Sequence, residues 1–473
     1  MILELNTGDT AWVLVSAALV LLMTPGLAFF YGGMVRAKGA LNMIMMSFIA
    51  MGTVGVLWVL YGYSLTFGNS LGGVIGDPTQ FAGLGSLMSP DAVVGTVPAL
   101  AFAAFQSAFA IIAVALISGS IADRTSFKAW TVFTGVWATL VYFPAAHWVF
   151  AFDGVAAEHG GWIANTVKAI DFAGGTAIHI NAGAAGLALA IVLGRRIDFL
   201  RKPMRPHNMT LVMLGAGLLW FGWFGFNAGS ALGANTTAAV AWINTLAAPA
   251  AAMLAWLGVE QLRDGHPTSL GAASGVVAGL VAITPAAGSV SPLGAVAIGL
   301  LAGVACAYAI GLKNRLGFDD SLDVVGVHLV GGLLGTLAIG LFADPGSPAG
   351  VAGLFYGGGV DQLGRQAVGA FSVLLYSFGM TLLIGFAINK TMGFRVSLAA
   401  ENNGIDLAEH SEVGYDLSPV YYSSFDGVRR TLMIEPDALP RDVREHVEAI
   451  RAASPAAPAD VADAATSPAE VNA

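Results

Sequence analysis

The sequence is poor in cysteine and in charge. Its 473 residues include one cysteine, Cys306, so no disulfide can form within the chain. Charged residues make up 11% of it, whereas they make up about 25% of a soluble globular protein. The net charge of −9 comes mostly from the carboxyl-terminal tail and indicates no nucleic-acid partner. So little charge argues against a soluble protein and favours lipid as the main solvent.

Long apolar runs take the place of charge. Hydrophobic residues make up 56% of the chain, and its mean hydropathy is +0.73. A membrane-spanning helix needs about 20 predominantly apolar residues, and the runs lack the short alternating pattern of an outer-membrane barrel. We therefore predict an all-α polytopic protein of the cell membrane with eleven transmembrane helices. They lie near residues 10–35, 41–67, 96–121, 127–150, 171–194, 207–230, 236–262, 268–287, 291–315, 322–343 and 365–393.

Basic residues predict the orientation. The first run has no basic segment before it and is too long for a signal-peptide core, so we interpret it as the first span. Basic loop residues favour the cytoplasm. One side carries only Lys168 and Arg365, so this side is predicted to be external, as is the amino terminus, with the carboxyl terminus cytoplasmic. The basic residues of the other side are Arg36, Lys38, Arg124, Lys128, Arg195, Arg196, Arg201, Lys202, Arg205, Arg263, Lys313, Arg315, Lys390 and Arg395.

Composition divides the chain into three parts. Residues 1–395 are the predicted membrane body, 396–423 a cytoplasmic segment, and 424–473 an Ala/Pro/Asp-biased tail that is predicted to be largely disordered. A short helix is expected near 439–452, because its apolar residues recur at helical spacing. This helix either docks on a partner or on the body's cytoplasmic face, or it is a marginal solvated helix.

An odd number of spans suggests two inverted five-helix halves plus one extra helix, an arrangement common in transporters. The fifth span carries Asp171 and His179, and the tenth carries Asp323 and His328. In each of these two spans the acid comes first, the histidine follows it, and small residues come after the histidine. The similarity falls where a five-plus-five duplication would place it.

Ionisable residues inside spans are candidates for function, and His179 and His328 are the clearest of them. Two neutral imidazoles can share one proton between them. A single histidine in a span, however, forms a hydrogen bond between helices as often as it lines a pore. Asp171 stands at a helix start, where its carboxylate either caps free backbone amides or binds a cation, and we favour capping. About 12 Å of helix separates it from His179, so the two cannot touch.

Aromatic residues gather near the ends of three spans. Phe109 follows Phe105 by one turn, Trp223 and Phe226 share a side with Ser230, and HWVF places Trp148 and Phe150 at a span end. Aromatics at span ends are usually interfacial anchors. A cluster of rings beside a hydroxyl can instead bind a desolvated monovalent cation. No metal-ligand spacing, nucleophile motif or phosphate loop lies near the histidines, so neither an enzyme nor a cofactor is expected.

These residues carry a resemblance to a known family. Over residues 10–395 the chain resembles the ammonium transporters of the Amt/Mep/Rh superfamily, of the bacterial Amt type. The order of the motifs over eleven spans makes chance similarity implausible. The matching strings are FYGGMVR at 30–36, AFQSAF at 104–109, ADR at 122–124, DFAGGTAIHIN at 171–181, WFGFNAGS at 223–230, GAASGVVAGLVAITPAAG at 271–288 and DVVGVHLVGG at 323–332.

The resemblance implies a homotrimer with a pore in each subunit, between the two halves. By matching position, His179 and His328 are the twin pore histidines and Trp223 lines the pore. Phe109 and Phe226 form the phenyl gate. The outer site that recruits ammonium, or methylammonium, is assigned to Phe109, Trp148, Phe150, Asp171 and Ser230.

The family mechanism explains these residue types. Ammonium would be recruited by ring faces and a hydroxyl, deprotonated, and passed as ammonia through an apolar pore. The proton would follow along the twin histidines, which makes uptake electrogenic. Two alternatives stay open: an electroneutral ammonia or carbon dioxide channel of the Rh type, and an ammonium sensor.

The chain departs from the family pattern in two places. Phe150 stands where Amt members usually have tryptophan, so we expect recruitment weaker by about 0.5–1 kcal/mol. In the segment 394–415, which resembles the one that crosses to a neighbouring subunit, Asn402 and Asn403 replace the acidic residues expected there. A trimeric PII-type regulatory protein is a plausible cytoplasmic partner.

Overall fold

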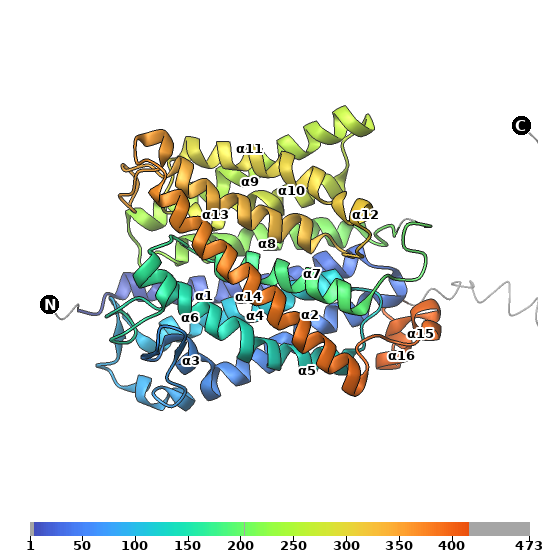
Figure 1. Ribbon diagram of the computed structural model, residues 1–473, viewed down its shortest axis with the longest axis horizontal. Coiled ribbons are helices and arrows are strands. Elements are labelled where there is room, and N and C mark those ends of the chain that lie inside the picture. The colour runs from blue at the N-terminus through green and yellow to red at the C-terminus, as the bar shows by residue number, and fades with distance from the viewer. Residues whose placement is uncertain (1–3, 203, 416–473) are drawn as a thin grey trace, which may run out of the picture. The chain divides into compact units, whose positions relative to one another are not determined.

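The computed structural model describes residues 4–202 and 204–415, and in these ranges eleven helices are long and apolar enough to cross a membrane. The prediction of eleven spans is confirmed, and Figure 1 shows the long helices running side by side. The spans are, in order, α1 (Thr7–Met34); η1, α2, η2 and α3 (Ala37–Gly39, Ala40–Leu57, Trp58–Gly62, Tyr63–Phe67); α4 and η4 (Ala99–Ile117, Ser118–Ile121); α5, η5 and α6 (Phe127–Trp137, Ala138–Tyr142, Phe143–Phe150); η7 and α7 (Gly175–Ile180, Asn181–Leu193); α8 (Met209–Gly229); α9 (Thr236–Asp264); α10 and η8 (Ser269–Ile283, Thr284–Ala286); α11 and α12 (Pro292–Ala309, Leu312–Leu316); η9 and α13 (Val325–Leu329, Val330–Phe342); and α14 (Asp361–Met392).

Short elements fill the connections between the spans. Two small hairpins lie between the second and third spans, and each is an antiparallel pair of two-residue strands. The short elements are β1 (Ser70–Leu71), β2 (Ile75–Gly76), η3 (Ala82–Met88), β3 (Val93–Val94), β4 (Val97–Pro98), η6 (Ile163–Val167), η10 (Leu354–Tyr356), α15 (Leu398–Asn403) and α16 (Ile405–His410).

Local sequence signals set where many spans begin. Five long helices start one residue after a side chain that accepts a hydrogen bond from their first-turn amides, which is the role that Asn, Ser and Thr play at helix starts. These cap residues are Asn6, Asn208, Asn235, Thr268 and Ser291.

The spans pack closely on one another because glycine lets their backbones meet. Helices α1 and α8 lie against each other, and a Cβ on Gly215 would come within 2.3 Å of the Phe30 amide nitrogen. Large apolar side chains cover much of the outside, among them Leu293 at 82% exposure and Leu375 at 68%. Such a surface suits a lipid environment, since water would leave it unfavourably solvated.

The two ends of the bundle differ in charge. We call the end that carries Phe150, Asp171 and Ser230 the serine end, and the end that carries Arg36, Arg196 and most other basic residues the arginine end. The predicted orientation places the serine end outside the cell.

The chain after α14 folds back on the arginine end. Asp406 in α16 accepts hydrogen bonds from the amides of Leu41 and Asn42, at 3.0 and 2.8 Å, and Glu401 in α15 pairs with Arg395 at 2.6 Å. Residues up to Gly414 therefore belong to the same compact unit as the membrane body (Figure 1). The helix expected at 439–452 and the tail of 424–473 lie outside the described residues.

Candidate functional site

Two histidines from the two halves meet inside the bundle. His179 lies in η7 and His328 in η9, and each of these elements is a π-helical turn at the start of its span. Their Nδ1 atoms are 3.2 Å apart, and the rings stack with centroids 5.3 Å apart and planes 16° from parallel. One ring must donate and the other accept. The sequence-predicted pair is thus in direct contact, in a geometry that can hold one proton between two rings.

Asp171 caps the span that carries His179. Its Oδ1 accepts from the amides of Gly174 and Gly175 at 2.8 and 2.7 Å, and its Oδ2 accepts from Thr176 and Ala177 at 2.8 and 3.0 Å. Burial raises the pKa of this carboxyl group, although the four amide donors act in the opposite direction. The carboxylate is occupied by backbone donors, so the structure favours capping over direct cation binding.

The acid that corresponds to Asp171 in the second half is Asp320, and the sequence-based choice of Asp323 is wrong. Asp320 accepts from the amides of Val324 and Val325 at 3.1 and 2.8 Å and so caps the tenth span. Asp323 instead has a left-handed backbone, with φ of 64°, and pairs with Lys313 at 2.6 Å. A signal was present in the sequence, because each capping acid precedes its histidine by the same interval.

Apolar side chains and one indole surround the histidine pair. Trp223 stacks on His179 at 5.4 Å and 14°, and its Nε1 donates to the Thr284 hydroxyl at 2.8 Å. A cavity of about 10 Å³ beside the pair is otherwise lined by apolar side chains such as Leu116 and Leu219. This volume holds about one water-sized molecule. The Nε2 of His179 is buried without a hydrogen-bond partner among the described atoms, so it is free to meet such a molecule.

Two stacked phenyl rings separate the histidines from the serine end. Phe109 and Phe226 have centroids 4.4 Å apart with planes 30° from parallel, and Phe105 packs edge-on against Phe109 at 4.7 Å. Both rings of the stacked pair are buried, and Phe226 also lies 6.1 Å from His179.

A cavity of about 530 Å³ opens on the other side of the phenyl pair, at the serine end. Phe109, Phe150, Asp171 and Ser230 all line it, and the Ser230 hydroxyl donates to the Phe226 carbonyl at 2.8 Å. Trp148 is not among the lining residues. Its indole is buried, donates to the Val74 carbonyl at 2.6 Å and packs against the Tyr376 ring with the planes tilted by 51°. The structure therefore brings together four of the five residues assigned to recruitment.

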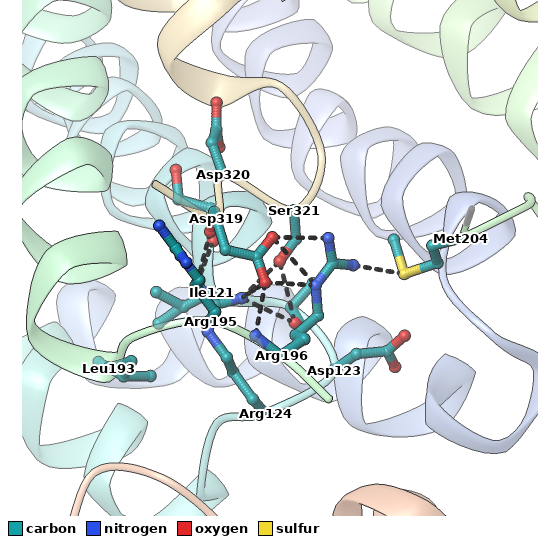
Figure 2. Close-up of polar contacts among 12 residues, drawn as sticks. Ile121, Asp123, Arg124, Leu193, Arg195, Arg196, Met204, Asp319, Asp320 and Ser321 are labelled. Carbon is teal, nitrogen blue, oxygen red and sulfur yellow. Dashed lines mark hydrogen bonds and ion pairs between the residues drawn. The ribbon is translucent and has the colours of Figure 1, made fainter. Parts of the chain in front are cut away.

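A buried ion cluster at the arginine end connects three loops between spans, and Figure 2 shows its contacts. Asp319 receives the Arg196 guanidinium at 2.7 and 2.9 Å, and the fully buried Arg124 donates to the Asp319 carbonyl and to the Ser321 hydroxyl, both at 2.6 Å. Burial alone would raise the pKa of Asp319, but the hydrogen bonds and charge of the two arginines outweigh it, so its pKa is lowered. The cluster fixes the backbone next to Asp320, and hence the start of the span that carries His328.

Fold and site together define a class: a polytopic helical membrane protein in which two buried histidines are in contact inside the bundle. The family model of the Ammonium Transporter Family matches residues 11–415. The chain belongs to this family, whose members are membrane transporters rather than enzymes.

Relatives and solved structures agree with this assignment. The ammonium transporter of Mycobacterium tuberculosis is 62% identical over 87% of this chain and 91% of its own length, and that of Corynebacterium glutamicum is 46% identical over 88% and 91%. A solved structure named "Sensor Amt Protein" superposes with a TM-score of 0.79 at 30% identity, covering 85% of this chain and 98% of that one. Saccharomyces cerevisiae Mep2 superposes at 0.76 with 32% identity, covering 88% and 93%.

Proposed function

We propose that this protein carries ammonium across the cell membrane, entering at the serine end as ammonium and crossing the bundle as ammonia. The observation that supports this proposal most is the order in which two cavities and the phenyl pair follow one another from the serine end to the histidines. An aromatic cavity leads to two closed phenyl rings, and behind them lies an apolar space large enough for one small neutral molecule.

Recruitment is assigned to Phe109, Phe150 and Ser230. Ring faces attract a cation, and the Ser230 oxygen can accept a hydrogen bond from one of the N–H groups of ammonium. Asp171 supports this site indirectly by fixing the start of η7, because its own oxygens are taken by backbone amides. Potassium has no proton to lose, so a buried apolar path opposes it strongly.

Conduction is assigned to the space between the phenyl pair and the arginine end. Ammonia has the size of water and fits a cavity of about 10 Å³. The proton left behind is passed between His179 and His328 through their 3.2 Å contact. Trp223 holds the His179 ring by stacking and is itself held by Thr284. Transport by this route moves charge.

The assembly and the regulator are part of the same proposal. The resemblance and the apolar exterior support a homotrimer, whose mass light scattering of the purified complex can measure. A PII-type protein would dock at the arginine end, beside α15 and α16. A sensing role is the second candidate, because one structural neighbour is called a sensor.

Uptake into liposomes containing the purified protein tests the proposal. Wild type should take up ammonium or methylammonium, and His179→Ala and His328→Ala should abolish charge movement or let the pore pass cations unselectively. Tyr61→Phe, which removes a hydroxyl that bonds Thr139 and lines neither cavity, is the control and should behave as wild type. Protein-independent uptake would contradict a transport role, and wild-type behaviour of both histidine variants would remove the histidines from the mechanism.

A further inference from the structure

The cavity at the serine end collects the two basic residues of that end. Lys168 and Arg365 are far apart in the sequence, and within the membrane body they are the only lysine or arginine residues outside the arginine-end set. Both line the cavity that contains Ser230 and Phe150. Acidic residues of the same end, such as Asp77 and Asp153, do not line it.

A hydrogen bond ties Arg365 to the backbone beside Lys168. Lys168 directly follows the η6 turn and has a left-handed backbone with φ of 60°. Arg365 in the first turns of α14 donates from Nη1 to the carbonyl of Val167, the residue just before Lys168, at 3.1 Å. The Arg365 guanidinium therefore lies against the chain segment that carries Lys168 and leads to Asp171.

Among the described residues neither side chain is held in an ion pair, although Asp361 lies one helical turn before Arg365 in α14. No carboxylate lies within 4.0 Å of Lys168 or Arg365 in the part of the chain that the structure describes, whereas Arg36, Arg196 and Lys313 all have such partners. Asp171 is the acid lining the cavity, but it is 8% exposed and its oxygens face four amides. The two exposed charged residues that line the cavity are thus both basic, although its proposed cargo is a cation.

We infer that Lys168 and Arg365 form an electrostatic barrier at the pore entrance that lowers occupancy by every monovalent cation. This inference rests on the proposed function. Ammonium overcomes the barrier by hydrogen bonding and ring contacts, which sodium and potassium cannot reproduce to the same degree. The entrance thereby selects by contact chemistry and not by charge.

Kinetics of uptake by full-length protein in liposomes tests this inference. Lys168→Gln and Arg365→Gln should each lower the apparent KM for ammonium about two-fold at low salt, because a unit charge about 10 Å away in water changes cation occupancy by roughly that factor. The difference from wild type should shrink as salt screens the charges, and the maximal rate should stay unchanged. Lys390→Gln, an exposed lysine at the other end of α14, is the control and should leave KM as it is.

Charge-conserving variants separate electrostatics from structure. Lys168→Arg and Arg365→Lys should retain the wild-type KM. Unchanged KM in both glutamine variants, or a change that high salt does not reduce, would overturn the barrier while leaving the proposed function in place. A wild type that moves no ammonium would overturn both.

Discussion

Removing the Asp171 carboxylate should loosen the start of the fifth span. In Asp171→Ala the amides of residues 174–177 lose the oxygens that they now meet at 2.7–3.0 Å. A buried amide left without a partner costs about 1–3 kcal/mol. The neighbouring cavity can supply water, so we take the lower value and expect a loss of about 4 kcal/mol in total.

Asp171→Asn should lie between the alanine variant and wild type. Its amide oxygen can still accept from two backbone donors, but its NH₂ group faces the other two and the charge is lost. We expect about half of the alanine effect, or roughly 2 kcal/mol. Asp361→Ala is the matched control, because this exposed acid lies at the same end of the bundle and should change stability by less than about 0.5 kcal/mol.

The assay is thermal unfolding of the purified protein in detergent, combined with ammonium uptake by the same variants. The unfolding midpoint should fall in the order wild type, Asp171→Asn, Asp171→Ala. If Asp171→Ala unfolds like wild type and only its affinity for ammonium drops, the carboxylate is a cation ligand and the capping argument fails.

Three further predictions concern other parts of the site. Burial raises the pKa of Asp320 to about 6, so the contribution of this group to stability is complete below its ordinary pKa and is lost as the pH rises through 6. The unfolding midpoint of wild type, measured relative to that of Asp320→Asn, should therefore fall between pH 4.5 and 7. A difference in midpoint that stays constant with pH would refute the raised pKa of Asp320. Phe150→Trp should lower the apparent KM for ammonium about two- to five-fold, and an equal or higher KM would count against ring-face recruitment. Gly183→Ala should destabilise the protein by about 1–3 kcal/mol and reduce uptake, because the added Cβ would come within 2.5 Å of the Leu329 amide beside His328. Uptake and an unfolding midpoint like those of wild type would show that α7 and η9 are not tightly packed at this point.

Much of the fold could be predicted because lipid imposes simple rules. Apolar length predicted all eleven spans to within a few residues, since a helix must satisfy its own backbone where no water is present. The twin histidines could be identified because ionisable residues are rare in such spans. Their contact at 3.2 Å and the stacked Phe109–Phe226 pair required the three-dimensional packing of distant spans.

The errors in the sequence interpretation have local physical causes. Asp323 lies closer to His328 in the sequence than Asp320 does, but Asp320 is the one placed to reach the amides that begin the tenth span. Trp148, which the resemblance assigns to recruitment, ends a span close to Phe150 in the sequence. Helical geometry turns the two side chains apart, and a connecting loop supplies the Val74 carbonyl to the indole. The ion cluster around Asp319 could not be predicted from a local sequence pattern, because its residues come from three separate loops.

The most direct test of the account is the current that follows a rapid ammonium jump on liposomes containing the wild-type protein. The account predicts a transient positive inward current that saturates with ammonium and is absent when potassium replaces it. Uptake of ammonia without any current would contradict proton transfer through the His179–His328 pair, and an equal current with potassium would contradict deprotonation at the phenyl gate.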